Sequence, residues 1–197
     1  MTEGFERKYR RILEILPDVA SCIDGNLILV GGTALALFHL RHRVSVDLDF
    51  VPVRGDDVKL KVALKGRLTK KGYRTSAGRF KNQFVVQFED TSIKVEVFSP
   101  DEKIRLIEEH VYGASRLKVA SLDDIFRMKI AAYRDRKEAR DLFDVFCVLK
   151  AAGKSTGLVK KLVAETGNPE NLADIEAMAT SPADAVGMRK VIEDASP

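Results

Sequence analysis

Long hydrophobic runs are absent from this 197-residue chain. No stretch approaches the roughly 20 apolar residues that a membrane-spanning helix needs, and the charged N-terminus lacks the apolar core of a signal peptide. Cysteine is scarce, and Cys22 and Cys147 lie far apart in the sequence, which favours two buried thiols over a disulfide or a zinc site. We therefore expect a globular, cytoplasmic protein with no membrane partner.

A strong excess of charge of one sign is absent as well, because the formal net charge at pH 7 is only +4. This value is compatible with a nucleic-acid partner but does not require one. Basic residues concentrate in the stretches 59–81 and 127–140. Solvated helix faces explain such runs more often than binding surfaces do, and both interpretations stay open.

Hydrophobic periodicity predicts a chain of mixed helices and strands. An apolar helical stripe covers residues 5–19, and a second helix begins after Asp56 or Asp57 and ends near Lys71. Strand-like runs cover residues 27–30, 46–51, 73–76, 83–88 and 93–98. From Ser121 onward the pattern is helical.

The stretch 27–53 is the most informative part of the chain. It reads as an apolar strand, a glycine turn, a short helix and a second strand that carries Asp47 and Asp49. Side chains alternate across a strand, so both carboxylates project to one face while Leu48 and Phe50 point into the core. Adjacent carboxylates repel each other unless a cation lies between them, and Mg²⁺ prefers such hard oxygen ligands. The pair therefore predicts a magnesium site.

A glycine turn directly precedes the short helix. Gly31, Gly32 and Thr33 place backbone N–H groups at the start of that helix, where a phosphate group binds favourably. A Gly-Gly turn before a helix is common, and taken alone it is more often structural. Together with Asp47 and Asp49, the turn indicates phosphoryl or nucleotidyl transfer.

Glu96 is a candidate third carboxylate. It lies in the middle of the strand-like run 93–98, on the face opposite the apolar residues. Alone, such a glutamate is more typical of a strand surface. If its strand pairs next to that of Asp47, a three-carboxylate cluster results, which suits two divalent ions or a proton acceptor for an incoming hydroxyl.

Four motifs in order resemble the AbiEii/AbiGii-like (MenT-like) nucleotidyltransferases of the polymerase-β-type superfamily. The motifs are Gly-Gly-Thr-Ala-Leu at 31–35, His-Arg-Val-Ser-Val-Asp-Leu-Asp at 42–49, Met-Lys-Ile-Ala-Ala at 128–132 and Arg-x-x-x-Arg-Asp-x-x-Asp at 136–144. The resemblance spans about residues 27–149 and leaves out the first helix and the tail after Gly153. His42 and Arg43 open the second motif, and we expect them to orient the loop before Asp47 or to contact phosphate.

The resemblance implies an α+β nucleotidyltransferase fold, with a small mixed β-sheet flanked by helices and a C-terminal helical region. We expect a nucleotidyltransferase core over residues 1–115 and a helical region over 116–197 that completes the nucleotide site. Many members are the toxin halves of bacterial toxin–antitoxin pairs, so we also expect a cognate antitoxin protein as a partner.

By the same resemblance, individual residues receive roles. The nucleotide-binding residues would be Gly31, Gly32, Thr33, Ser45 and Lys129. The metal ligands, for Mg²⁺ or Mn²⁺, would be Asp47, Asp49 and Glu96. Lys129 would meet the triphosphate, and Asp141 would be the acid of the Arg-Asp-x-x-Asp helix. The predicted catalytic set is thus Asp47, Asp49, Glu96, Lys129 and Asp141.

The charged helix around this last motif has a second interpretation. Arg140 can reach Asp144, or Asp141 can orient Lys129, because residues three or four apart share a helix face. A ladder of surface ion pairs along residues 134–144 would explain the same charges without any function.

We therefore expect a Mg²⁺-dependent nucleotidyltransferase that moves a nucleoside monophosphate from a nucleoside triphosphate to an acceptor hydroxyl. The resemblance favours an RNA 3′ end, with tRNA as the first candidate. Three alternatives stay open: transfer to a protein or a small molecule such as an aminoglycoside, nucleotide binding without turnover, and a kinase-like transfer of the γ-phosphate. The nucleotide itself is not predicted.

Overall fold

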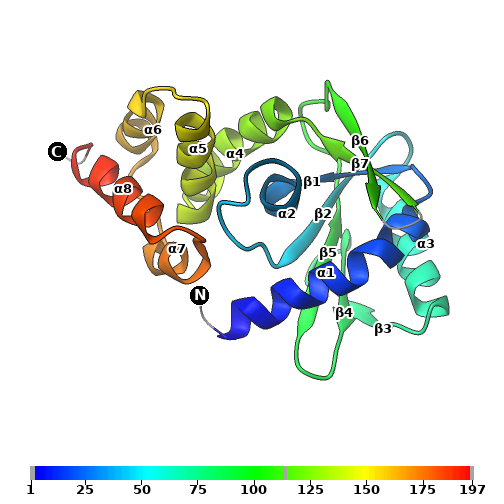
Figure 1. Cartoon of the computed structure of the whole chain (residues 1–197). Coiled ribbons are helices and arrows are strands. Elements are labelled where there is room, and N and C mark those ends of the chain that lie inside the picture. Colours follow the sequence, from blue (N-terminus) through cyan, green and yellow to red (C-terminus); the bar gives the residue numbers. More distant parts are fainter. Residues whose placement is uncertain (1–2, 113–114, 196–197) are drawn as a thin grey trace. The chain divides into compact units, whose positions relative to one another are not determined.

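The computed structural model describes residues 3–112 and 115–195, without the side chain of Tyr112. Contacts group these residues into two units, whose elements Figure 1 labels. The sheet unit contains residues 3–34, 45–112 and 115–121, and the helical unit contains residues 35–44 and 122–195. Grouping by contacts does not test independent folding, so the domain boundary expected after residue 115 stays a prediction.

Within the described residues, seven strands form one mixed sheet in the order β3-β4-β5-β2-β1-β7-β6. The strands are β1 (Leu27–Val30), β2 (Asp47–Pro52), β3 (Arg74–Ala77), β4 (Gln83–Gln87), β5 (Ser92–Val97), β6 (Ile107–Tyr112) and β7 (Ser115–Ala120). β1 pairs antiparallel with β2 and parallel with β7, and β2 pairs parallel with β5. The remaining pairs are antiparallel. The expected mixed sheet flanked by helices is confirmed.

Three helices belong to the sheet unit: α1 (Glu3–Ile23), α2 (Gly31–Ala34) and α3 (Asp57–Lys70). α1 and α3 contact each other and both contact β5, so they lie on the same face of the sheet. α3 begins where the sequence predicts, because a carboxylate oxygen of Asp56 accepts a hydrogen bond from the Lys59 backbone N–H at 2.8 Å.

Alternation along β2 and β5 divides their side chains into two sets. Leu48 and Phe50 of β2 are fully buried, as are Ile93, Val95 and Val97 of β5. Side chains at the intervening positions project to the opposite face, and these include Asp47, Asp49 and Glu96. Apolar burial on one face therefore fixes where the carboxylates project on the other.

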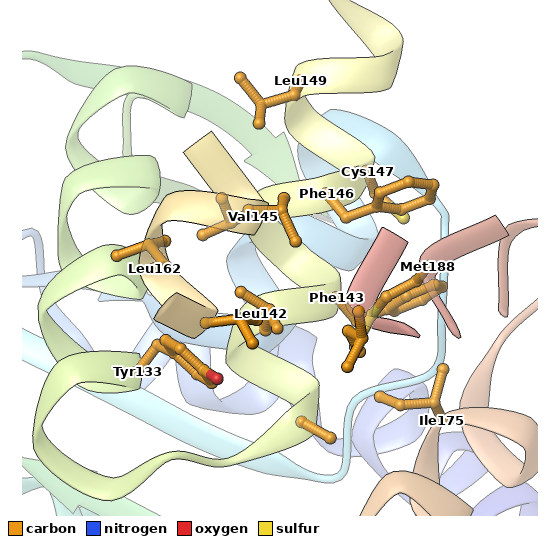
Figure 2. Packing of buried hydrophobic residues seen from close by; sticks show 14 of the residues in the cluster. Tyr133, Leu142, Phe143, Val145, Phe146, Cys147, Leu149, Leu162, Ile175 and Met188 are labelled. Carbon is orange, nitrogen blue, oxygen red and sulfur yellow. The ribbon is translucent and has the colours of Figure 1, made fainter. Parts of the chain in front are cut away.

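The helical unit is built around one central helix. Its elements are a π-helix, η1 (Leu35–Leu40), and the helices α4 (Leu122–Arg136), α5 (Ala139–Ala151), α6 (Gly157–Thr166), α7 (Leu172–Met178) and α8 (Pro182–Glu193). Every residue of α5 from Asp141 to Leu149 is buried. Figure 2 shows Phe143 and Phe146 of α5 in one apolar cluster with Met188 of α8. A helix buried on all sides is held by its neighbours from every direction.

Two parts of the fold are absent from the sequence prediction. The hairpin β6–β7 forms one edge of the sheet, and its outer strand β6 exposes Ile107 and Val111, so apolar alternation along β6 is weak. η1 contains a wide turn, in which the Arg41 N–H bonds to the carbonyl of Ala36 at 3.1 Å, and single π-turns have no sequence signature.

The expectation for the two cysteines is confirmed. Cys22 and Cys147 are free and buried. Among residues 3–112 and 115–195, no helix is both long and apolar enough to cross a membrane.

Candidate active site

The predicted carboxylates come together on β2 and β5. In the parallel pairing of these strands, Asp49 lies opposite Glu96 and Asp47 lies opposite Lys94. Side chains at paired positions project to the same face of a sheet. The strand pairing that the Glu96 hypothesis required is therefore confirmed, and the three carboxylates form a row, here called the acidic row.

A lysine lies within the acidic row. The Lys94 ammonium is 3.5 Å from a carboxylate oxygen of Asp47 and 3.5 Å from one of Glu96. Burial acts to lower the pKa of Lys94, but the charges of Asp47, Asp49 and Glu96 outweigh it and raise the pKa. The row thus attracts a cation, and in this structure the side chain of Lys94 supplies it.

Two amides fix the position of Glu96. The side chain of Asn82 donates to one carboxylate oxygen at 2.9 Å, and the side chain of Gln83 donates to the other at 2.9 Å. Gln83 also pairs with Glu96 across the β4–β5 ladder. A carboxylate offers about four acceptor sites, so Glu96 keeps acceptor capacity while its orientation is set.

The glycine turn touches the acidic row directly. Gly31 has a left-handed φ of +71°, and a Cβ at this position would lie 2.6 Å from a carboxylate oxygen of Asp49. Only glycine allows this approach. The hydroxyl of buried Thr33 donates to the backbone carbonyl of Asp47. This hydrogen bond connects α2 to β2, so the Thr33 hydroxyl already donates to a protein partner.

The donor set of the acidic row suits a hard divalent cation. Three carboxylates project from one face of two adjacent strands, and an ammonium already lies between two of them. In the part of the chain that the structure describes, no group of three His, Cys, Asp or Glu side chains is arranged as a ready metal site. The metal sites expected at Asp47, Asp49 and Glu96 stay a prediction.

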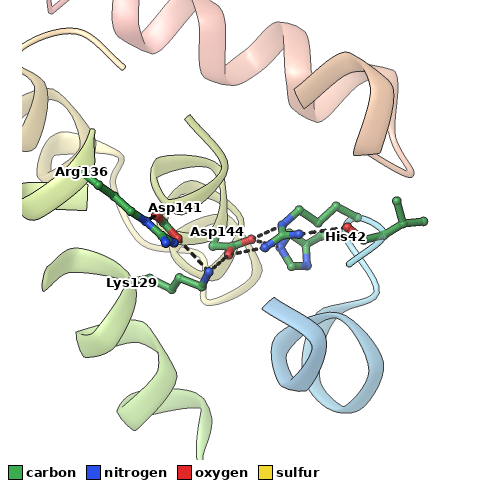
Figure 3. Close-up of polar contacts among 7 residues, drawn as sticks. His42, Lys129, Arg136, Asp141 and Asp144 are labelled. Atoms are coloured by element: carbon green, nitrogen blue, oxygen red, sulfur yellow. Dashed lines mark hydrogen bonds and ion pairs between the residues drawn. The ribbon is translucent and has the colours of Figure 1, made fainter. Parts of the chain in front are cut away.

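A second polar cluster lies inside the helical unit, around Asp144 of α5 (Figure 3). Asp144 has no exposed surface, and its two oxygens accept from Arg43 at 2.6 and 2.8 Å. His42 contacts it at 2.7 Å and the Lys129 ammonium at 2.7 Å. Burial acts to raise the pKa of Asp144, but the charges of Arg43 and Lys129 hold the pKa well below its usual value.

Lys129 is shared between two buried carboxylates. Its ammonium lies 2.8 Å from Asp141 as well as close to Asp144, and Asp141 also accepts from Arg136 at 2.7 Å. Burial acts to raise the pKa of Asp141, while Lys129 and Arg136 lower it below its usual value. Of the two predicted arrangements, Asp141 orienting Lys129 is confirmed. The surface ladder is wrong for Asp141 and Asp144, because both are fully buried.

His42 is the neutral member of this cluster. Burial lowers the pKa of its imidazole, with the Asp144 hydrogen bond opposing this shift. Asp144 can only accept, so His42 donates from Nε2. Its Nδ1 finds no hydrogen-bond partner among the described residues. In the neutral ring with a proton on Nε2, Nδ1 carries no proton, so leaving it unpaired costs less than leaving an N–H group unpaired. Both side chains bind Asp144, and the Arg43 guanidinium also donates to the Val44 carbonyl in the loop before Asp47 at 2.9 Å. This contact agrees with the expected role in orienting that loop, and the contact with phosphate stays a prediction.

The sequence-predicted residues therefore fall into two groups. Asp47, Asp49, Glu96, Gly31 and Thr33 meet in the sheet unit, where Gly32 and Ser45 are also buried. Lys129 and Asp141 meet in the helical unit. The catalytic and nucleotide-binding roles of all these residues stay predictions.

Sequence reasoning did not predict three sets of contacts. Lys94 lies two positions before Glu96 and so shares its strand face, which the sequence shows, but its ion pairs with Asp47 and Glu96 were not predicted. Asn82 could not be found, because its contact with Glu96 depends on the β4–β5 register. Arg43 could not be found as a partner of Asp144, because 101 positions separate the two residues.

Solved structures of known proteins share this fold. At 20% identity and a TM-score of 0.59, JHP933 of Helicobacter pylori matches 99% of this chain and 93% of its own. A second H. pylori protein, described as a nucleotidyltransferase, has 18% identity and a TM-score of 0.57, with 100% of both chains covered. A nucleotidyltransferase-like antigen of Paracoccidioides brasiliensis has 16% identity and a TM-score of 0.53, covering 94% of this chain and 93% of its own. These likenesses show a shared nucleotidyltransferase-like fold.

A search of curated protein sequences finds no match to this chain. The family model described as "Nucleotidyl transferase AbiEii toxin, Type IV TA system" matches residues 14–194. The limits of 27–149 expected for the resemblance are therefore too narrow, since the match also includes residues 14–23 of α1 and the helices after Gly153. With nearly the whole sequence matched, the chain is a nucleotidyltransferase that belongs to the AbiEii toxin family of type IV toxin–antitoxin systems.

Proposed function

We propose that this enzyme uses Mg²⁺ to transfer a nucleoside monophosphate from a nucleoside triphosphate to a hydroxyl group of RNA, with a tRNA 3′ end as the favoured acceptor. The observation that carries the proposal is the register of β2 and β5, which sets Glu96 opposite Asp49 and beside Asp47. Three carboxylates in one row are costly for a fold unless they serve a cation.

Asp47, Asp49 and Glu96 would hold the divalent ion. When bound, the ion would offset charge on the phosphates and on the leaving pyrophosphate. Glu96, held by its two amide donors, is the candidate that accepts the proton of the incoming hydroxyl. Gly31 keeps Asp49 against the glycine turn, whose backbone N–H groups are the candidate contacts for phosphate oxygens. The roles of Lys129 and Asp141 at the triphosphate stay predictions.

The RNA backbone would contact basic residues of α3 and the segment after it. Lys59 and Lys70 are exposed there, and Lys81 and Arg79 are exposed before β4. Neutralisation of phosphates by lysine and arginine supplies most sequence-independent affinity for RNA.

Membership in a toxin–antitoxin family supports a protein partner. We propose that a cognate antitoxin opposes the growth inhibition caused by this enzyme. Co-expression with the neighbouring gene products of its source, compared with expression alone, would reveal such protection as restored growth.

The direct test incubates the purified protein with total RNA, Mg²⁺ and each of the four nucleoside triphosphates, labelled at the α-phosphate in turn. We expect label in a tRNA-sized band with at least one nucleotide, and no label for Asp49→Asn. Label from the γ-phosphate and none from the α-phosphate would identify a kinase-like reaction instead.

Two further outcomes separate the alternatives. Label that enters protein or a small molecule, with RNA unlabelled, would replace RNA as the acceptor. Nucleotide binding in calorimetry without any transfer would indicate a binding module that lacks turnover.

A further inference from the structure

The loop between β3 and β4 presents an exposed aromatic ring between two cations. Its central sequence is Arg79-Phe80-Lys81, and all three residues are exposed. Phe80 exposes 57% of its surface, whereas most large apolar side chains of the sheet unit are buried. The Arg79 guanidinium lies 5.3 Å from the centre of the Phe80 ring, within cation–π range.

The backbone of this loop is closed on itself. The Gly78 N–H donates to the carbonyl of Gln83 at 3.3 Å, and the Gln83 N–H donates to the carbonyl of Phe80 at 3.0 Å. A Cβ at Gly78 would lie 2.4 Å from the Cβ of Gln83, so only glycine lets the two ends meet this closely. Phe80 is therefore presented by a short, hydrogen-bonded turn.

The same loop is tied to the acidic row. Asn82 donates from its side chain to Glu96 at 2.9 Å, and its carbonyl accepts from the Val97 N–H at 3.0 Å. Phe80 is two residues before Asn82, which limits their Cα separation to about 7 Å. The segment 80–82 therefore carries an exposed aromatic ring and also binds a candidate catalytic carboxylate, Glu96 of β5.

We propose that Phe80 stacks against an unpaired nucleobase of the acceptor RNA, while Arg79 and Lys81 neutralise its phosphates. This inference rests on the proposed function and names the part of the substrate that docks beside the acidic row. Aromatic rings between cations are how proteins bind single strands without strong base preference, because every base has a face that can stack.

The chain contains no tryptophan, which allows a specific spectroscopic test. Phe80→Trp adds a single fluorophore at the platform, and Val111→Trp adds one at the opposite edge strand, β6, where Val111 is 78% exposed. The probes are an RNA hairpin with a four-nucleotide 3′ overhang, the same hairpin with a blunt end, and nucleoside triphosphates alone. We expect the overhang RNA to quench Phe80→Trp and to leave Val111→Trp unchanged.

Affinity provides the second readout. By fluorescence anisotropy of the labelled overhang RNA, Phe80→Ala should weaken binding about tenfold or more, the loss expected for one stacked base, while Val111→Ala should not change it. Arg79→Gln should weaken binding and reduce its salt dependence.

Three results would overturn the inference: overhang RNA that binds without quenching Phe80→Trp, quenching by nucleoside triphosphate alone, or no RNA binding by the unmodified protein. These outcomes are independent of turnover. If RNA is labelled but Phe80 variants bind normally, only the platform is wrong. If Phe80→Trp is quenched but no nucleotide is transferred, the proposed function is wrong instead.

Discussion

Asp144 is a buried carboxylate surrounded by cationic and hydrogen-bonding partners. Its fully buried carboxylate neutralises Arg43 and Lys129 and accepts from His42. Removing one member of a buried ion pair leaves the others charged and without compensation, which costs about 3–5 kcal/mol. We expect Asp144→Ala to lower the free energy of unfolding in urea by that amount.

Glu165→Ala is the matched control for Asp144→Ala. Glu165 pairs with Arg134 and Lys161, but 44% of its side chain is exposed. Exposed ion pairs contribute at most about 1 kcal/mol. Equal losses for the two variants would contradict the assignment of Asp144 as the centre of the buried network.

The stability of the helical unit should depend on pH through His42. Burial lowers the folded-state pKa of His42 below its unfolded value of about 6.5. Below pH 6.5 the unfolded chain therefore binds a proton that the folded protein excludes, and stability falls with pH by up to about 1.4 kcal/mol per unit. His42→Gln should flatten the unfolding free energy between pH 7.5 and 5.5, whereas an unchanged slope would exclude this origin.

Lys94 should compete with divalent ions for the acidic row. Its ammonium lies 3.5 Å from both Asp47 and Glu96, and a charge at this distance contributes about 1 kcal/mol per pair even in water. We expect Lys94→Met to bind Mn²⁺ about tenfold more tightly in calorimetry and to be less stable without metal. Lys118→Met is the control, because the Lys118 ammonium donates to the Gly25 carbonyl at 3.0 Å, and this variant should bind Mn²⁺ like the unmodified protein.

At the scale of elements, the junction of β1, α2 and β2 depends on Gly31. A residue with a side chain would be strained there by the left-handed φ of +71°. Its Cβ would also lie 2.6 Å from a carboxylate oxygen of Asp49. We expect Gly31→Ala to cost at least about 1–2 kcal/mol and to abolish RNA labelling by displacing Asp49. Gly66→Ala, in the open middle of α3, should instead stabilise the protein by about 0.5–1 kcal/mol. Normal labelling by Gly31→Ala would contradict the role of the turn.

Elements with strong alternation could be predicted from the sequence. β2 and β5 each bury an unbroken apolar set on one face, so a period of two predicts the projection of Asp49 and Glu96 and gives the strand bounds to within one residue. β6 could not be predicted in the same way. This edge strand exposes Ile107 and Val111 to solvent, which removes the contrast between its two faces, although its partner β7 buries Leu117 and Val119.

The candidate site was predictable only as far as local spacing reaches. Asp47 and Asp49 are two residues apart, and Lys129 and Asp141 belong to neighbouring helices joined by a short turn. The contacts of Asn82 with Glu96 and of Arg43 with Asp144 require tertiary pairing, which no single-sequence period encodes.

At the scale of the whole molecule, a net charge of only +4 implies that RNA affinity depends on where the cations lie. For single strands, each neutralised phosphate adds about 0.7 to the magnitude of the slope of log affinity against log salt concentration. We expect Lys59→Gln and Lys70→Gln each to reduce that slope by about this amount. Lys161→Gln, on α6 of the helical unit, serves as the control, and equal effects of all three would exclude α3 as an RNA surface.

The split composition of the helical unit has a consequence for synthesis of the chain. η1 and the residues that follow it contact α5, yet Arg43 and Asp144 are separated by 101 positions. At ribosomal rates of about 5–20 residues per second, Arg43 leaves the exit tunnel about 5–20 s before Asp144 does. Over that interval the Arg43 guanidinium lacks the carboxylate that neutralises it in the folded protein, and His42 lacks its hydrogen-bond acceptor. The helical unit can therefore form only after α5 has been synthesised, and a chain released before α5 cannot complete it.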